Sequence, residues 1–221
     1  MLPTLTCQSL AFVFYFLYGS FFEWWFHKYL FHSPKLIKAT FKAHALVHHQ
    51  RYKFAPDSYE WQEGQEKDHI TMDWFALPLF LGFHLPFLML AQWATGIPSV
   101  WGGMAAITFY YAVYEYCHFF MHVPSGHWFE KTRAFRFAKE HHRIHHKYML
   151  QNLNVFFPLA DKCLGTYRSV ASLAEKDRYV SLEERKQQVQ AVVSTGAEVS
   201  SPARPVQAIR LNKQAEALSK K

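Results

Sequence analysis

The sequence predicts an all-α integral membrane protein, and three observations support this prediction. Three long apolar stretches lie within the first 120 residues, lysine and arginine are confined to two segments, and the histidines are grouped at helical spacing. At 221 residues, the chain is long enough for one domain with a sizeable core. We assign residues 1–172 to a membrane-embedded domain and residues 173–221 to a polar C-terminal extension.

The apolar stretches cover residues 5–26, 72–94 and 97–120. Each is long enough to cross a bilayer, which takes ~20 mostly apolar residues. The Gly-Pro-containing turn at residues 95–98 joins the second and third stretches into a helical hairpin. Two alternatives remain open: the first stretch as a signal peptide, although it lacks a basic n-region, and all three as buried helices of a soluble protein.

The positions of the basic residues indicate how the chain lies in the membrane. A net charge of +7 would suit nucleic acid, but all 24 lysines and arginines lie in residues 28–67 or 131–221. Such segregation is typical of a membrane topology, so we expect a membrane and no nucleic acid as partner. The positive-inside rule places both basic segments in the cytoplasm and the N-terminus outside.

The cysteines and the polar C-terminal part of the chain give no sign of a further functional site. Cys7, Cys117 and Cys163 are far apart and form no CxxC pair, so we expect reduced thiols. After Tyr167 the chain becomes polar and nearly free of aromatic residues. We expect one exposed helix at residues 181–193 and a disordered tail at residues 194–221.

Eleven of the fourteen histidines fall in four clusters, all on the predicted cytoplasmic side. A neutral imidazole has one free nitrogen lone pair and is the commonest protein metal ligand. A lone histidine is more often hydrogen-bonded or on the surface. Four clusters on one side of the membrane instead predict more than one bound metal ion.

The spacing within each cluster predicts which histidines share a metal ion. His118 and His122 are four apart, and the sets His44, His48, His49 and His142, His145, His146 contain the same spacing. Residues three and four apart share one helical face, so each set is predicted to point at one centre. His27 and His32 are five apart, or ~140° around an ideal helix, so the helix must end or bend between them.

About ten imidazoles are too many for one zinc ion, which is satisfied by four ligands. Ten imidazoles are instead enough to bind two metal ions. Imidazole suits iron, zinc, copper and nickel. A redox-active pair of irons is the option that would justify placing such a site at a lipid interface.

The segments HKYLFH, HALVHH, HFFMH and HRIHH resemble, in order, the histidine boxes of the fatty acid hydroxylase and sterol desaturase superfamily. Asn154, Asp161, Gly165 and Thr166 resemble the pattern that closes the family's domain. The resemblance covers roughly residues 21–167. It implies a transmembrane helical bundle with a cytosolic helical cap that holds a dinuclear metal site.

The resemblance also implies the metal ligands and the cofactors. The ligands would be His27, His32, His44, His48, His49, His118, His122, His142, His145 and His146. The cofactors would be two iron ions, which zinc can replace in a purified sample, with O2 as co-substrate. Glu115, His141, Asn154 and Asp161 are candidates for supporting the ligands from behind.

The implied reaction is O2-dependent hydroxylation of an unactivated C–H bond in a fatty acyl chain or sterol, with desaturation as the alternative. The chain has no cytochrome b5 signature, so we expect a separate electron donor, either cytochrome b5-like or a ferredoxin with its reductase. The expected location is the endoplasmic reticulum in a eukaryote or the inner membrane in a bacterium. The family often has four membrane segments, and a partly inserted one around residues 25–31 would supply the fourth.

Other readings of the same residues are weaker. Glu66 before His69 and Glu115 before His118 give the Glu-x-x-His motif of soluble di-iron bundles, but the long bundle helices are missing. A metal transporter would need ionisable residues along a path through the bilayer, and His84 is the only one in mid-span by our assignment. A hydrogen bond to a neighbouring helix explains His84 as well. A catalytically inactive interaction protein is disfavoured by ten intact ligand positions, and His69 and His127 are expected at the surface or behind ligands.

Overall fold

The structure is a computed structural model that describes residues 4–67 and 69–169. Within these residues all regular structure is helical, which confirms the predicted all-α class. They belong to one compact unit, Met1–Ser172. The helix predicted at residues 181–193 and the tail at residues 194–221 lie outside the described residues.

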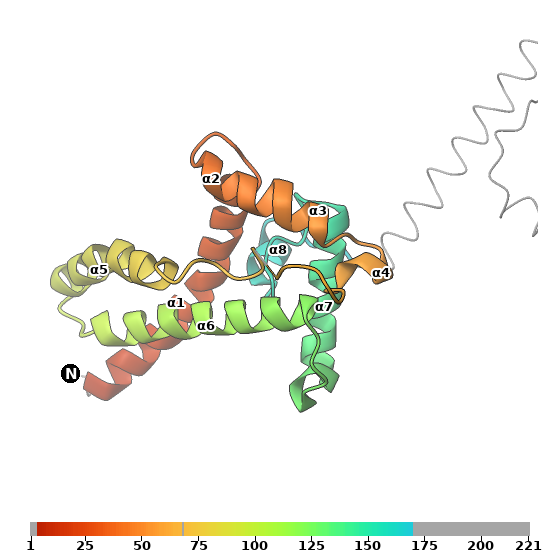
Figure 1. The fold of residues 1–221 in the computed structure, drawn as a ribbon. Helices are drawn as coiled ribbons and strands as arrows, with labels where there is room; N and C mark the ends of the chain where they lie inside the picture. Colours follow the sequence, from red (N-terminus) through yellow and green to blue (C-terminus); the bar gives the residue numbers. More distant parts are fainter. Residues whose placement is uncertain (1–3, 68, 170–221) are drawn as a thin grey trace, which may run out of the picture. The chain divides into compact units, whose positions relative to one another are not determined.

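Three long helices form the elongated part of the unit: α1 (Thr4–Phe26), α5 (Ala76–Thr95) and α6 (Val100–His122). Helix α6 packs against both α1 and α5. In Figure 1, α5 and α6 lie side by side while α1 crosses them. Glycine permits the close approach, because a Cβ atom on Gly19 would lie 2.6 Å from the Tyr110 ring.

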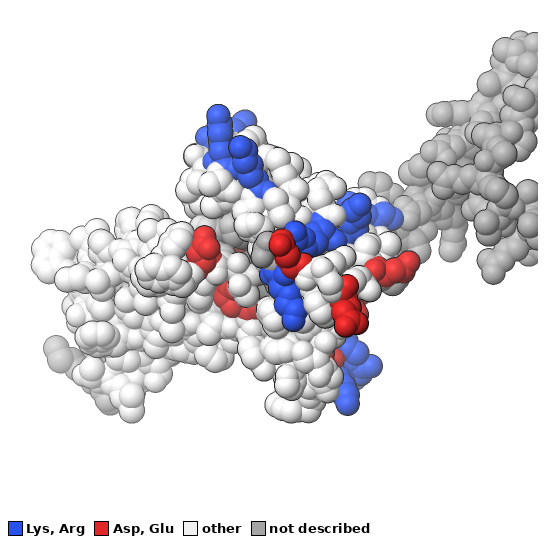
Figure 2. Space-filling view, viewed as in Figure 1, with Lys and Arg blue, Asp and Glu red and all other residues white. Residues whose placement is uncertain are grey.

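Two of the described helical segments are long and apolar enough to cross a membrane, Thr4–Phe31 and Ala76–Thr95. They correspond to the first two predicted spans. Helix α6 forms where the third span is predicted but does not reach the same hydropathy, so its crossing of the bilayer remains a prediction. In Figure 2, the visible face over α5 carries no charged side chains, and lysine and arginine gather around the short helices.

The hairpin between α5 and α6 is confirmed. Gly96 ends α5 with a φ of 66°, in the left-handed region that favours glycine, and its amide donates to the Gln92 carbonyl at 2.9 Å. At its other end, α5 begins later than expected. The predicted span covers residues 72–94, whereas α5 begins at Ala76, after a turn in which the Ala76 amide donates to the Asp73 carbonyl at 2.9 Å.

Short helices gather around the far ends of α1 and α6 (Figure 1). Two of them are π-helices, η1 (His27–Phe31) and η2 (Lys42–His48), and α2 (Lys38–Phe41) and α3 (His49–Arg51) flank the second. The longest is α7 (Arg133–Lys147), whose first turn is capped by the Thr132 hydroxyl, which accepts from the Phe135 amide. The others are α4 (Pro56–Tyr59), η3 (Trp128–Lys131) and α8 (Leu159–Cys163).

Candidate metal centre

Ten histidines converge on two compact groups at this end of the molecule. The first group contains His27, His32, His44, His49 and His145, and the second contains His48, His118, His122, His142 and His146. Within each group the candidate ligand atoms all lie within 4.8 Å of one another. Nine of the ten side chains are buried and His32 is half-buried. These are the ten histidines that the sequence singled out as candidate ligands.

The two groups are direct neighbours. The rings of His49 and His146, one from each group, stack with centroids 4.3 Å apart. The pairs His44–His48 and His142–His145 also stack across the boundary, at 5.0 and 5.5 Å. The arrangement therefore offers two adjacent sites with five imidazoles each.

The predicted division of the histidines between the two sites is wrong for two of the sets. His44 and His49 belong to the first group, but His48 between them belongs to the second. On α7, His142 and His146 belong to the second group and His145 to the first. Each helix passes between the two sites and sends rings to both sides, so helical spacing alone could not assign them. His118 and His122 do share one group, as predicted.

The π-helices explain how residues five apart reach one site. In a π-helix each amide bonds to the carbonyl five residues earlier, so side chains at that spacing lie above one another. The His32 amide donates to the His27 carbonyl at 3.1 Å, and the two rings stack at 5.0 Å. His44 and His49 have the same spacing around η2, and their Nε2 atoms are 3.2 Å apart. The expected end or bend between His27 and His32 is thus a change from α- to π-helix.

Backbone carbonyls fix the tautomer of four of the imidazoles. The Nδ1–H groups of His27, His122 and His145 donate to the carbonyls of Leu153, Tyr59 and Gln151 at 2.5, 2.8 and 2.9 Å. His146 donates in the same way to the Tyr52 carbonyl. Because a carbonyl can only accept, the Nε2 atom of each of these rings carries a lone pair.

These lone pairs face one another. The distances between them show whether a metal ion fits. In the first group, Nε2 of His145 lies 3.0 Å from that of His32 and 3.1 Å from that of His49. In the second group, Nε2 of His142 lies 3.3 Å from that of His122 and 3.1 Å from that of His146. His142 could donate one proton to only one of these two acceptors. Shared cations satisfy all the lone pairs at once, so the residues fit a metal ion in each group.

The second group also contains buried nitrogens that the described residues do not satisfy. Both ring nitrogens of His48 and the Nδ1 atom of His142 have no hydrogen-bond partner there. Buried polar atoms are normally hydrogen-bonded, so such an orphan needs an explanation. A metal ion at this position explains the ring of His48, because one of its nitrogens would be a ligand.

Burial also keeps the imidazoles neutral. It lowers the pKa of His48, His142 and His146 well below the ordinary value, and neighbouring histidines lower it further. Burial lowers the pKa of His145 to about 4. Only the neutral ring has a lone pair for a metal, so desolvation keeps the site ready to bind at neutral pH.

The segment after α7 holds the first group in place, and Asp161 lies at its centre. The Asp161 carboxylate accepts from the Leu153 amide at 2.9 Å, and the Leu153 carbonyl in turn orients the His27 ring. It also accepts from the Thr166 hydroxyl at 2.7 Å and faces Nε2 of His141 at 3.0 Å. Burial alone would raise the pKa of Asp161, but the hydrogen bonds from His141, the Asn154 amide and Thr166 outweigh it, so the pKa lies below its ordinary value and the carboxylate stays ionised.

Glu23 is a supporting residue that the sequence analysis missed. It is buried on α1, one turn before His27, and accepts from the Val155 amide at 2.7 Å, the Asn154 side chain at 3.0 Å and the Tyr110 hydroxyl at 2.6 Å. It joins α1, α6 and the segment after α7. A carboxylate inside an apolar stretch, four residues before a ligand candidate, was the signal that would have revealed it.

The other candidate supporting residues have varied surroundings. His141 lies outside both groups, against Asp161, and Asn154 donates to the Ser20 carbonyl at 2.8 Å as well as to Glu23. The Glu115 carboxylate accepts from the Met72 amide at 3.2 Å and so holds the turn before α5. A role of Glu115 behind a ligand remains only a prediction.

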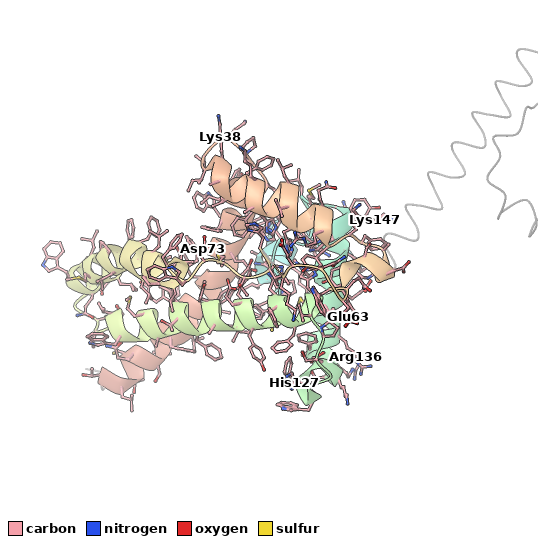
Figure 3. All side chains as sticks on the ribbon, viewed as in Figure 1. Lys38, Glu63, Asp73, His127, Arg136 and Lys147 are labelled. Atoms are coloured by element: carbon pink, nitrogen blue, oxygen red, sulfur yellow. The ribbon has the colours of Figure 1, made fainter. Side chains whose placement is uncertain are left out.

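The remaining singled-out residues lie away from the histidine groups. Glu66 is exposed and pairs with Arg51 at 3.8 Å, so the described residues give no support to a soluble di-iron bundle motif there. His127 is exposed directly before η3, toward the opposite end of α7 from Lys147 (Figure 3). His84 is buried and bonds to Tyr18 on α1 at 3.2 Å, which is the expected bond to a neighbouring helix.

The fold and the site define a helical, histidine-rich protein with two adjacent candidate metal sites. Comparison with known families gives its class: the sequence model of the fatty acid hydroxylase family matches residues 12–166. The match covers more than half of the chain, so this protein belongs to the fatty acid hydroxylase family. The family membership and the two apolar helices together indicate a membrane protein and an oxidoreductase. No curated protein and no solved structure matches the chain.

Proposed function

We propose that this protein is a di-iron monooxygenase that hydroxylates an unactivated C–H bond in a membrane lipid. The observation that carries the proposal is the pair of adjacent groups of five imidazoles, buried and with their lone pairs directed at common points. Five imidazoles per group exceed the four ligands that zinc prefers, whereas imidazole also suits iron. The family match supports oxidation of a lipid.

Two iron ions held by these groups would supply O2 activation. The balance is one C–H bond and one O2, with two electrons and two protons, giving one alcohol and one water. We propose that the electrons come from a separate donor, either cytochrome b5-like or a ferredoxin with its reductase. Desaturation of the same class of lipid is the alternative outcome, and it would depend on small differences in how the substrate carbon is placed.

The protein's own contribution is to orient the histidine rings and to shield them from bulk water. The carbonyls of Tyr52, Tyr59, Gln151 and Leu153 hold four rings so that their Nε2 atoms point inward. Such partners fix the ring orientation and raise the basicity of a ligand. His48, His122, His142 and His145 have no exposed surface, so bulk water does not reach these ligands.

We also propose the placement of the protein in its membrane. The basic segments around the histidine groups would face the cytoplasm by the positive-inside rule. Helices α1 and α5, with α6 as a third crossing, would anchor the site at the lipid interface. The membrane would be the endoplasmic reticulum in a eukaryote or the inner membrane in a bacterium.

The test combines metal content with oxidation. The purified protein is expected to hold about two irons per chain, and to oxidise lipid extracts only when O2 and a reductant are supplied. His145→Ala is expected to reduce the iron content and abolish the product, because it removes a ligand and leaves the Gln151 carbonyl without its donor. His127→Ala is the matched control, since His127 is exposed and outside both groups.

Two results would overturn the proposal. One is His145→Ala protein that binds iron and oxidises lipid as the unmodified protein does. The other is metal flux across liposomes without O2 consumption, which would identify a transporter instead.

A further inference from the structure

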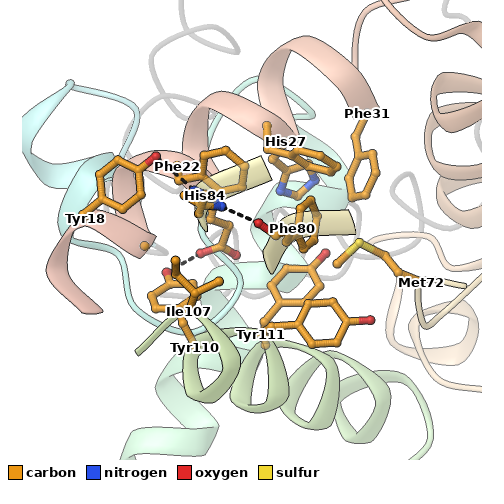
Figure 4. A pocket seen from close by; sticks show the side chains of 14 residues that line it. Tyr18, Phe22, His27, Phe31, Met72, Phe80, His84, Ile107, Tyr110 and Tyr111 are labelled. Carbon is orange, nitrogen blue, oxygen red and sulfur yellow. Dashed lines mark hydrogen bonds between the residues drawn. The ribbon is translucent and has the colours of Figure 1, made fainter. Parts of the chain in front are cut away.

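An apolar cavity lies among α1, α5 and α6, and we call it the inner cavity (Figure 4). Its wall is almost entirely aromatic and aliphatic, and Phe22, Phe80 and Ile107 are typical members. His27 of the first histidine group also lines it. The inner cavity therefore leads from the candidate metal centre into the apolar part of the molecule.

Two pairs of polar side chains in this wall are hydrogen-bonded to each other. The His84 Nδ1–H donates to the Phe80 carbonyl at 2.7 Å, so its Nε2 accepts the Tyr18 hydroxyl at 3.2 Å. The Tyr110 hydroxyl donates to the Glu23 carboxylate at 2.6 Å. The wall is mostly apolar, and these four polar side chains are already hydrogen-bonded, which favours a hydrocarbon occupant, because a polar one would lose its hydrogen bonds to water with few partners to replace them.

A second cavity adjoins the first, and we call it the outer cavity. The two share five lining residues, which are Phe26, Phe31, Met72, Phe80 and Tyr114. The outer cavity reaches one histidine of each group, His44 and His118. Its wall also contains hydrogen-bonding side chains, those of Thr40, His69, Thr71 and Asp73. The histidine groups thus adjoin both cavities, an apolar inner one and an outer one that also contains hydrogen-bonding side chains.

The helices close together beyond the Tyr18–His84 pair. A Cβ atom on Gly103 would lie 2.4 Å from the Leu88 side chain and 3.0 Å from the Tyr15 ring. Leu88 is 1% exposed and Ala106 has no exposed surface. Because this packing leaves no room for one added methyl group, the inner cavity ends at Tyr18 and His84.

We infer that the inner cavity holds the hydrocarbon end of the substrate and that Tyr18 and His84 form the floor that limits its length. The inference rests on the proposed lipid oxidation. The polar end of the lipid then lies in the outer cavity, beside Thr71 and Asp73. A hydroxyl or amide headgroup fits there better than a carboxylate, which Asp73 would repel.

The floor sets a distance along the chain. Tyr18 precedes His27 by nine residues on one helix, which corresponds to roughly 13 Å along the axis. A lipid is therefore oxidised at a carbon that leaves about this length of hydrocarbon beyond it. A longer tail meets the floor and is rejected.

Photolabelling tests the orientation without any oxidation. The probes are two long-chain alcohols, one with a diazirine at its terminal carbon and one with the diazirine next to its hydroxyl. The purified full-length protein in detergent is labelled with each probe, and the labelled peptides are identified by mass spectrometry. The terminal probe is expected to label residues near Tyr18 and His84, and the other probe residues near Thr71.

Chain length is measured by competition. Unlabelled alcohols of increasing length displace the terminal probe, and near the length limit one surplus methylene is expected to weaken binding roughly 10-fold. Tyr18→Ala combined with His84→Ala removes the floor. The longest alcohol that still competes should then be longer by at least one member of the series. Tyr18→Phe keeps the ring and should leave the limit unchanged. Phe14→Ala is the matched control, because Phe14 lies one turn earlier on α1 and is 63% exposed.

The outcomes separate this inference from the proposed function. Labelling by the terminal probe at the outer cavity, or a limit unmoved in a Tyr18→Ala, His84→Ala protein that still binds the probe, overturns the inference. If that double variant does not fold, the labelled positions in the unmodified protein decide instead. Expected labelling in a protein that oxidises no lipid supports the cavity assignment and counts against the proposed function alone.

Discussion

Four backbone carbonyl oxygens determine which nitrogen of a histidine ring carries the proton. The carbonyls of Tyr52, Tyr59, Gln151 and Leu153 each accept from an Nδ1–H group and leave the Nε2 lone pair for a metal. The sequence could identify the ten rings, because histidines in such clusters have few other uses. It could not identify the carbonyls, because every residue has one and only the fold brings these four to the rings.

At the residue scale, Glu23→Gln is expected to destabilise the protein. The carboxylate accepts three hydrogen bonds in a buried site, and an amide nitrogen cannot accept. We expect a loss of about 1–3 kcal/mol in the free energy of unfolding, measured by thermal unfolding in detergent. Glu66→Gln is the control, since its side chain is 76% exposed and should change stability by less than about 0.5 kcal/mol. Equal effects of the two substitutions would contradict the role given to Glu23.

The buried imidazoles also predict how stability depends on pH. Burial lowers the pKa of His48, His142 and His146 in the folded state, so the unfolded chain binds more protons once the pH falls below about 6.5. The metal-free protein should therefore have a constant unfolding temperature above about pH 7 and a falling one below about pH 6.5. Each such ring contributes about 1.4 kcal/mol per pH unit.

Thermal unfolding of chelator-treated protein across this pH range measures the effect. His142→Ala should reduce the pH dependence, because one buried ring is lost, and His127→Ala, which removes an exposed ring, is the control. An unfolding temperature that stays constant down to about pH 5 would show that the rings titrate normally in the folded state.

At the scale of elements, the sequence predicted the π-helices only indirectly, through a histidine spacing that does not fit a regular α-helix. His27 and His32 cannot share a face of a regular α-helix, and the hydrogen bond from the His32 amide to the His27 carbonyl resolves this. The same device around η2 brings His44 and His49 to one group and turns His48 to the other. Helical spacing assumes 3.6 residues per turn, so it assigned these rings wrongly.

Deletion of Tyr29 tests whether η1 contains one more residue in its turn than an α-helix would. Without it, His27 and His32 would be four apart and could share a face of a regular α-helix. We expect the variant to retain most of its metal, measured by elemental analysis of purified protein. Deletion of Phe14 from the regular part of α1 is the control, since it rotates the preceding residues by about 100° against their neighbours and should destabilise the protein. Complete loss of metal with Tyr29 deleted and the fold retained would contradict this interpretation.

At the scale of the whole molecule, the described unit separates an apolar end from a charged end. The long helices carry the apolar side chains, and the short helices bring the histidines and most charged residues together (Figures 1 and 2). Composition predicted this separation, because lysine and arginine are missing from the apolar stretches. The long-range bonds that join the ends, such as Trp24 to Thr166 at 2.8 Å, lie outside what composition or spacing can predict.

The two histidine groups predict that the stability of the whole unit depends on metal. Within each group, buried ring nitrogens lie close together, and one proton between two rings can satisfy only one lone pair, whereas a bound cation would satisfy all of them. A metal that binds the folded state alone stabilises it by about 2.7 kcal/mol at a hundred times its dissociation constant. We therefore expect chelation to lower the unfolding temperature, and either Fe²⁺ or Zn²⁺ to restore it. Only iron, with O2 and a reductant, should also restore lipid oxidation, because zinc has no redox chemistry. If neither metal raises the unfolding temperature of the chelated protein, the groups are packed imidazoles and not metal sites, and the proposed reaction has no place to occur.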